Sequence, residues 1–303
     1  MGHVFAADHP KFGRVAIKLG ARDTPSVRAL LRREAQVTMA LSHPNVVRVH
    51  EIGETRDGIP YYTMPLVEGT TLRRLVECWG RQAPASVAGV LAQICDALAA
   101  TLARGLVHGD LKPTNIMISS ERGVAPRVTV LDFGLSTAVG TVQRPSFDPG
   151  GLLGTPAYLA PEVLRGSGLS ERSELYAVGL VGYWLLTGQH AFAATGVREL
   201  EHCHAHVEPV SPSALVGEPL PYALEDAIMR CLRKRPEARP RSVAWLAAEL
   251  WSIEKMLQAE PTEPCSRVPI LPPAVLDPEA ASIESTVPDL SVRFDTAAVT
   301  VRA

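Results

Sequence analysis

A short polar segment, residues 108–115 with the sequence His-Gly-Asp-Leu-Lys-Pro-Thr-Asn, carries the side chains best suited to chemistry. Asp110, Lys112 and Asn115 place a carboxylate, an ammonium and a carboxamide within six positions. These groups suit one task, which is to hold a hydroxyl nucleophile, a transferring phosphoryl group and a divalent metal together. The apolar run at 116–118 predicts a strand that anchors the loop. The segment therefore favours phosphoryl transfer over a merely solvated loop.

Four further segments fit the same chemistry. They are Val-Ala-Ile-Lys ending at Lys18, a glutamate at position 34, Asp-Phe-Gly at 132–134, and Gly-Thr-Pro-Ala-Tyr-Leu-Ala-Pro-Glu at 154–162. Alone, a lysine that ends an apolar strand or an Asp-Phe-Gly triplet means little. In this order and spacing the motifs resemble those of the eukaryotic-like (Hanks-type) serine/threonine protein kinases of bacteria. The resemblance covers residues 1 to about 257.

The resemblance implies a role for each charged residue at the reacting centre. Asp110 would orient the acceptor hydroxyl of a protein serine or threonine and accept its proton. Lys112 would hold the γ-phosphate of ATP. Lys18, fixed in place by Glu34, would hold the α- and β-phosphates. The implied partners are ATP and protein substrates, including the kinase itself through autophosphorylation.

The resemblance also implies a metal site, a nucleotide site and an activation segment. Asn115 and Asp132 would bind Mg²⁺. The ATP-binding residues would be Gly2, Val4, Ala16, Lys18, Met64 as the gatekeeper, Pro65, Val67 and Met117. Thr155 would lie near the acceptor and, with Lys112, favours serine/threonine over tyrosine. Glu162 would pair with Arg239 in a buried salt bridge.

Three positions depart from the family pattern. The family's glycine-rich loop, Gly-x-Gly-x-x-Gly-x-Val, is represented only by Gly2-His3-Val4, so we expect ATP to bind more weakly. We expect that the assigned start site lies too far downstream or that the chain is a fragment, rather than that the native protein lacks half of its glycine-rich loop. Gly109 replaces an arginine that pairs with an activation-loop phosphate, which predicts a weak dependence on phosphorylation there. Glu174 replaces the usual aspartate beneath the catalytic loop, and its extra methylene leaves that anchor's geometry open.

Two other function classes compete with the protein kinase. A catalytically weak pseudokinase, acting as a scaffold, fits the incomplete glycine-rich loop, Gly109 and Glu174. Every residue of direct chemistry is nevertheless present, which favours an enzyme. A kinase of small-molecule hydroxyls would share the two lobes but would lack the segment at 154–162.

A group of histidines invites a metal-binding interpretation. His202, His204 and His206 alternate along the chain with Cys203 among them, and on a strand all three imidazoles would share one face. The segment matches a helix of the kinase large lobe, where residues at this spacing do not converge. We therefore do not expect a three-histidine metal site.

Positioning these residues requires an α+β fold with two lobes. The predicted small lobe covers 1–67 and consists of an antiparallel sheet, whose first strand is missing, and one helix. A mainly helical large lobe covers 68–257, and a proline-rich flexible tail or linker covers 258–303. Hydrophobic periodicity and turn residues predict strands at 1–6, 12–19, 46–52, 59–67, 116–118 and 128–131, and helices at 25–41, 71–79, 84–104 and from 173 through 186. Residues 135–153 show no apolar period and predict a mobile loop.

The bulk composition fits this reading. The chain has 303 residues, 46% of them apolar, which is enough for a large core. A net charge of −2 argues against nucleic-acid binding. The five cysteines are scattered and odd in number, which is typical of a reducing cytoplasm. The apolar run Leu175–Leu186 is shorter than the roughly 20 residues that span a bilayer, so no membrane span is expected.

Overall fold

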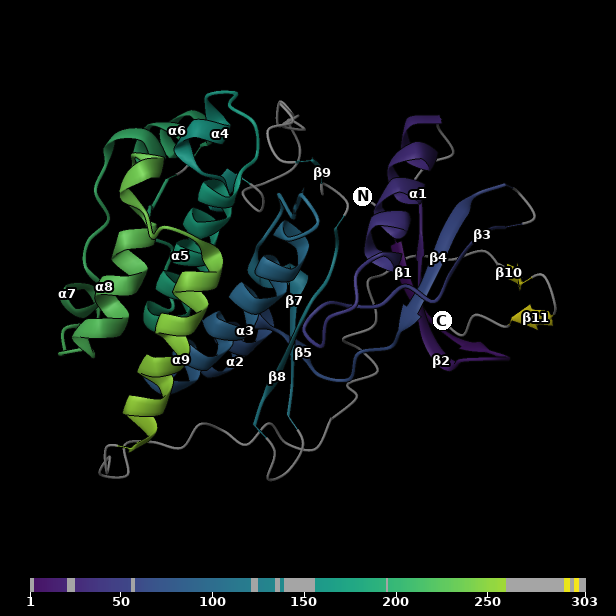
Figure 1. The fold of residues 1–303 in the computed structure, drawn as a ribbon, viewed down its shortest axis with the longest axis horizontal. Coiled ribbons are helices and arrows are strands. Elements are labelled where there is room, and N and C mark those ends of the chain that lie inside the picture. Colours follow the sequence, from purple (N-terminus) through teal and green to yellow (C-terminus); the bar gives the residue numbers. More distant parts are fainter. Residues whose placement is uncertain are drawn as a thin grey trace.

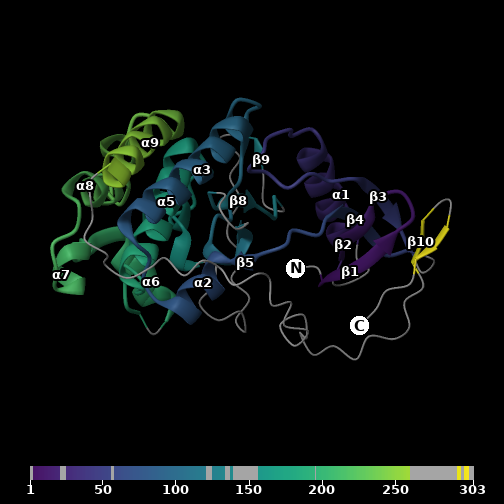
Figure 2. The ribbon, with the colours of Figure 1, turned by 90° about the horizontal axis from the view of Figure 1, so that it is seen from below.

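The computed structural model describes residues 3–20, 25–55, 58–120, 125–133, 137–138, 156–194, 196–259, 292–294 and 297–299. Figure 1 shows a sheet with helix α1 on one side of the molecule and the remaining helices on the other. Figure 2 gives the same arrangement from below. The predicted two-lobed α+β fold is confirmed.

The small lobe is a four-stranded antiparallel sheet with the order β1-β2-β4-β3. Its elements are β1 (His3–His9), β2 (Gly13–Leu19), α1 (Pro25–Met39), β3 (Glu51–Glu54) and β4 (Pro60–Pro65). Side chains alternate along β2, so Val15 and Ile17 enter one apolar cluster and Ala16 enters another. Lys18 follows Ala16 on the same face of β2, opposite Tyr62 of β4. The alternation thus aims a buried lysine at the face that α1 covers.

The predicted strand over 46–52 is wrong for most of its length. Only Glu51–Glu54 belongs to β3, and Val46 instead forms a parallel bridge with Val130 of the large lobe. The backbone N–H of Val47 donates to the carbonyl of Val130 at 3.0 Å. The start of the run thus pairs across the two lobes, which its local pattern does not reveal, whereas the N–H of His50 donates to the Thr63 carbonyl of β4 at 2.8 Å.

The centre of the large lobe is helix α5 (Glu171–Thr187), which is buried over almost its whole length. Ser170 begins it with a capping box to Ser173, and Gly188 ends it in the left-handed conformation. The other helices are α2 (Leu72–Trp79), α3 (Pro84–Leu102), α4 (Pro161–Leu164), α6 (Val197–His206), α7 (Pro212–Val216), α8 (Tyr222–Cys231) and α9 (Val243–Ala259). Among the described helices α3 alone is long and apolar enough to cross a membrane, but most of that stretch is buried, and α3 packs against α5 and α9.

Two small sheets carry the polar loops. Strands β5 (Thr70–Thr71), β7 (Ile116–Ser119) and β8 (Arg127–Val130) form one, and β6 (Leu106–Val107) pairs with β9 (Thr137–Ala138) in the other. The predicted loop at 135–153 therefore contains a short strand, and its residues 135–136 and 139–153 lie outside the described residues. The single-turn helix η1 (Pro113–Asn115) leads from the catalytic loop into β7.

Two segments extend the expected boundaries. Helix α9 continues to Ala259, two residues beyond the predicted end of the large lobe at 257. Within the predicted tail, β10 (Val292–Phe294) and β11 (Ala297–Val299) form an antiparallel hairpin that the sequence reasoning did not anticipate.

Candidate active site

The catalytic loop, residues 108–115, brings two polar side chains onto one carboxylate. The Lys112 ammonium donates to Asp110 Oδ2 at 2.6 Å, and the Asn115 amide donates to the same oxygen at 3.1 Å. Asn115 also donates to the Asp110 backbone carbonyl at 2.9 Å, which closes the loop. Among the described residues no partner occupies Asp110 Oδ1. That oxygen is therefore available to accept a hydrogen bond from a substrate hydroxyl.

A buried histidine supports this loop from behind. The His108 side chain is fully buried, and its Nδ1 accepts the Asp110 backbone N–H at 3.2 Å. Its Nε2 must then carry the proton and donate to the Leu131 carbonyl at 3.0 Å. Burial lowers the pKa of His108, so the ring stays neutral in this tautomer. The ring also contacts Phe133, so one side chain links the catalytic loop to the Asp-Phe-Gly segment.

Lys18 is held from two sides, by one carboxylate of the small lobe and one of the large lobe. Its ammonium donates to Glu34 Oε1 of α1 at 2.7 Å, so the predicted Lys18–Glu34 pair is confirmed. It also forms an ion pair with Asp132. The Tyr62 hydroxyl donates to the same Glu34 oxygen at 2.7 Å. Burial and the neighbouring carboxylate raise the pKa of Tyr62, so it remains a donor at all physiological pH values.

Asp132 stands in an uncommon backbone conformation. Its φ of +64° makes it the one non-glycine residue with positive φ in the described part of the chain. Such conformations cluster at functional sites, where the surroundings enforce them. The preceding residue, Leu131, donates its N–H to the Asn115 carbonyl at 2.8 Å, which holds the two predicted metal ligands on adjacent backbone segments. Carboxylate and amide oxygens are the donors that Mg²⁺ prefers, so this pair fits the metal that the fold family implies.

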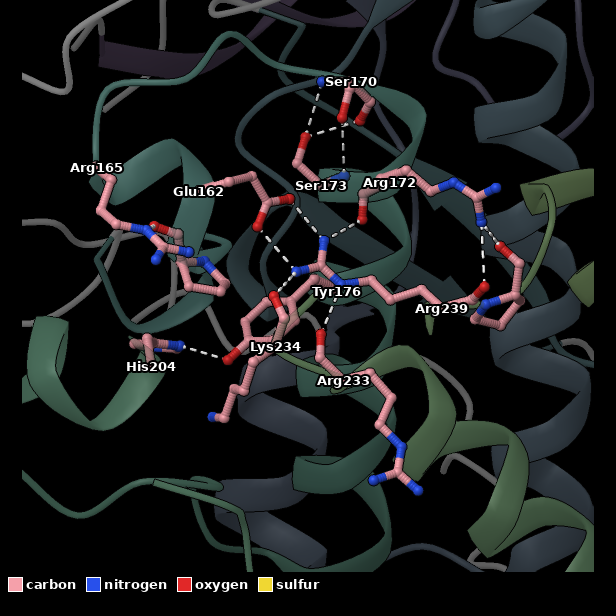
Figure 3. A network of polar contacts seen from close by, with 12 residues as sticks. Glu162, Arg165, Ser170, Arg172, Ser173, Tyr176, His204, Arg233, Lys234 and Arg239 are labelled. Atoms are coloured by element: carbon pink, nitrogen blue, oxygen red, sulfur yellow. Dashed lines mark hydrogen bonds and ion pairs between the residues drawn. The ribbon is translucent and has the colours of Figure 1, made fainter. Parts of the chain in front are cut away.

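A second ion pair joins Glu162 to Arg239 in the large lobe (Figure 3). Arg239 donates to both oxygens of Glu162, at 2.6 and 2.8 Å, which confirms the predicted bridge. Its remaining donors reach backbone carbonyls of residues 172, 233 and 234. The guanidinium also stacks over the ring of Tyr176 in α5. With its side chain fully buried, Arg239 fastens the start of α4, and with it the end of the activation segment, to the lobe core.

Comparison with known proteins places this geometry in a family. The protein kinase domain model matches residues 1–251. The chain belongs to the protein kinase family. The serine/threonine-protein kinase PknB of Mycobacterium tuberculosis is 34% identical over 269 residues, covering 88% of this chain and 40% of that protein. The probable serine/threonine-protein kinase PknB of Corynebacterium glutamicum is 34% identical over 265 residues, covering 84% and 40%. Pkn1 of Myxococcus xanthus is 37% identical over 248 residues, covering 80% and 35%.

The chain is thus a protein kinase domain similar to bacterial Hanks-type serine/threonine kinases, the family that the sequence motifs resemble. The chain spans about two fifths of the length of the PknB relatives that it matches.

The kinase residues predicted to contact adenine fall into two groups. Ala16, Met64 and Val67 belong to one apolar cluster around β2 and β4. The remaining three lie outside that cluster: Val4 on the edge strand β1, Pro65 at the end of β4, and Met117 on β7 of the large lobe. The first group thus lies on the face of the sheet that carries Lys18. The predicted residues Gly2 and Thr155 lie outside the described residues.

Glu174 anchors the kinase catalytic loop despite its extra methylene. Its Oε1 accepts the backbone N–H of Gly109 at 2.7 Å, so the longer side chain reaches the loop. Gly109 has a φ of +79°, a conformation that glycine adopts without strain. The second oxygen, Oε2, is buried without a hydrogen-bond partner among the described residues, beside a small cavity that Asp110 and Leu159 also line. Burial is the main cause that raises the pKa of Glu174 to about 7, and the Asp110 carboxylate adds to it.

This raised pKa predicts that Glu174 makes the folded kinase less stable as the pH rises. Between its ordinary pKa of 4.5 and about 7, the folded state holds a proton that the unfolded state has released. The stabilising contribution of this proton is therefore fully present below pH 4.5. As the pH approaches 7 it is lost, and the free energy of unfolding falls by roughly 3 kcal/mol. Glu174→Gln lacks this titration, so its stability relative to the parent should increase by that amount from about pH 4.5 to about pH 7.5. Urea unfolding at both pH values measures the difference, and a difference that stays constant would contradict the prediction.

Sequence reasoning missed several supporting residues of the kinase site. Tyr62 was read only as part of a strand, although it shares the Glu34 oxygen with Lys18. Asn45 lies outside every motif named above, but its side chain donates to the Val128 carbonyl at 2.7 Å. The available signal for Tyr62 was its cross-strand register with Lys18, which requires the pairing of β2 with β4 to be known.

Proposed function

We propose that this domain transfers the γ-phosphoryl group of ATP to serine and threonine hydroxyls of proteins, with Asp110 as the catalytic base. The observation that carries the proposal is the position of Lys18, which contacts Glu34 of the small lobe and Asp132 of the large lobe at once. A single ammonium that joins both lobes at the cleft suits the phosphates of a bound nucleotide.

In this reaction the role of each charged residue follows from its charge and its position. Asp110 Oδ1 accepts the proton of the acceptor hydroxyl, while its Oδ2 is held by Lys112 and Asn115. When ATP is present, Lys112 turns its charge to the γ-phosphate and Lys18 to the α- and β-phosphates. This catalysis consists of positioning and charge neutralisation, and it requires no covalent intermediate.

We propose that Asn115 and Asp132 hold Mg²⁺ on the phosphates. The bound ion would neutralise the charge that develops on the transferring group. The Asn115 amide nitrogen donates to Asp110, so its Oδ1 is the atom that would hold a metal. Lys18 neutralises the Asp132 carboxylate in this structure, and the nucleotide's phosphates would compete for that ammonium.

Removal of the metal tests the proposed reaction. With radiolabelled ATP, Mg²⁺ and a generic basic protein as acceptor, we expect labelled phosphoserine and phosphothreonine. An excess of EDTA should abolish the labelling, and a return of Mg²⁺ should restore it. A catalytically weak scaffold would bind ATP without labelling any protein, under either condition. Labelling of tyrosine alone would contradict the choice of acceptor.

Phosphorylation of the activation segment should matter little to this domain. Gly109 has no side chain with which to bind a phosphate there, so ordering of the loop cannot rely on the family's arginine contact. The candidate acceptor sites are Thr137, Thr141 and Ser146, and the last two lie outside the described residues. A variant with alanine at all three positions should keep more than a tenth of the parent's transfer rate. A loss greater than tenfold would show that a phosphate does order the segment.

We also propose a location, partners and domain boundaries for this kinase. We place the domain in the cytoplasm, with ATP, protein substrates and its own chain as partners. The small lobe would end near residue 67, the large lobe would span 68–257, and residues 258–303 would serve as a tail or linker. None of these assignments involves nucleic acid.

A further inference from the structure

The three histidines of α6 separate onto two faces of the helix. His204 points inward, where its side chain is fully buried and its Nδ1 lies 2.9 Å from the Tyr176 hydroxyl. Burial lowers the pKa of His204 to about 3, so this ring is neutral and structural. His202 and His206, one turn apart, are both exposed on the outer face. The expectation that three imidazoles do not converge is correct, but two of them do.

The distance between the two exposed rings matches that of a metal chelate. Their centroids lie 5.1 Å apart. In a tetrahedral site each ligating nitrogen lies about 2.0–2.1 Å from Zn²⁺, which puts each ring centre about 3.2 Å from the ion and the two centres about 5.2 Å apart. Among the described residues no hydrogen bond or ion pair engages either ring. The nitrogens are therefore free to turn toward one ion without breaking an existing contact.

The local electrostatics also favour a cation at this position. Both residues lie in the last turn and a half of α6, whose carbonyl end carries a partial negative charge. Lys234 donates to the Cys203 carbonyl and stacks over Phe192, whereas Arg198 lies one turn before His202, toward the start of the helix and away from its carbonyl end. Phe192 packs against His204, so Lys234 belongs to the buried side of the helix. The partial negative charge at the carbonyl end of α6 is therefore available to a cation bound on the outer face.

We propose that His202 and His206 form a two-histidine surface site for a divalent transition-metal ion such as Zn²⁺, Ni²⁺ or Cu²⁺. Water completes the coordination, because the described residues contain no cluster of three or more histidine, cysteine or acidic ligands. Imidazole selects these ions over Mg²⁺, which requires oxygen donors, so the site is chemically separate from the proposed catalytic metal site. A bound ion would link two successive turns of α6, which packs against α4 and against the single turn η2 (Pro156–Tyr158).

Copper titration of the full, untagged chain tests the proposal, with His3→Ala in the parent and in every variant, because a free amino terminus followed by His3 would itself bind Cu²⁺ tightly; each protein is first stripped with EDTA. We expect one Cu²⁺ per chain at the tightest site, with an electron paramagnetic resonance spectrum that shows two imidazole nitrogens. His202→Ala should weaken this binding by about tenfold or more and leave a one-nitrogen spectrum. Zn²⁺ should raise the melting temperature of the parent but not of the variant.

The matched control keeps two imidazoles on α6 at a spacing that cannot chelate. The double variant Glu201→His with His202→Ala places them five residues apart, on different faces of the helix. It should bind Cu²⁺ no better than His202→Ala, although its histidine count equals that of the parent. Equal affinity in parent, single variant and double variant would overturn the proposal, and so would a one-nitrogen spectrum of the parent.

Discussion

Asp110→Asn should reduce phosphoryl transfer by about 10²- to 10⁴-fold, the usual contribution of a general base. The substitution keeps the size and shape of the side chain but removes the charge that accepts the proton. It also places an amide group next to the Lys112 ammonium and the Asn115 amide, both of which donate to Asp110 Oδ2. Phosphate incorporation into a serine/threonine acceptor protein, measured at saturating ATP, gives the loss directly.

The same variant should leave nucleotide binding almost unchanged. Lys18, which would hold the α- and β-phosphates, and its partner Glu34 do not contact Asp110 in the described structure; of the proposed phosphate-binding residues only Lys112 does. ATP affinity, measured by fluorescence titration, should therefore stay within a few-fold of the parent. Asp226→Asn serves as the matched control, because Asp226 pairs with Arg230 on α8 and far from the cleft. Transfer by Asp110→Asn at more than a tenth of the parent rate would show that another group takes the proton.

Arg239→Ala should destabilise the domain by about 3–5 kcal/mol, the cost of breaking a buried ion pair. The guanidinium makes two hydrogen bonds to Glu162 and three to backbone carbonyls, and its side chain is fully inaccessible to solvent. Its removal leaves the Glu162 carboxylate buried without a counter-charge. Urea unfolding followed by circular dichroism measures the loss.

A second substitution separates the ion pair from simple packing. The double variant Arg239→Met with Glu162→Met leaves no uncompensated charge, so it should be more stable than either variant that lacks one partner. Arg235→Ala is the surface control, because its pair with Glu237 is exposed and its loss should change stability little. A double variant less stable than Arg239→Ala would show that the pair itself, rather than the orphaned charge, determines the effect.

The reacting centre was accessible from the sequence because its spacing is local. Asp110, Lys112 and Asn115 lie within one loop, and the order of the other motifs assigned Lys18 and Glu34 to it. The reach of Glu174 to Gly109 was not predictable, because one methylene changes a contact whose geometry depends on how α5 lies beneath the loop. Its orphaned Oε2 could be found only in the folded chain.

Other differences arise where distant segments pair. The Val46–Ile52 run has the composition of a strand, and the sequence cannot show that Val46 pairs with Val130 rather than with a neighbouring strand. The fold of each lobe follows from periodicity, caps and turns, whereas the contacts between lobes depend on tertiary placement. The same limit explains why the convergence of His202 with His206 became visible only after the segment was known to be helical.

The bridge between Val46 and Val130 fixes one end of helix α1, so that a rotation of the helix displaces its two ends unequally. Since Asn45 and Val47 are also hydrogen-bonded to β8, the end of α1 near Met39 is fastened to the large lobe. With a rise of 1.5 Å per residue, Glu34 lies only about 8 Å from this pivot, whereas the start of the helix at Pro25 lies about 21 Å from it. Any swing of α1 therefore moves its start almost three times as far as Glu34. A displacement at the start of α1 would therefore be reduced about threefold at Glu34, and so at its contact with Lys18.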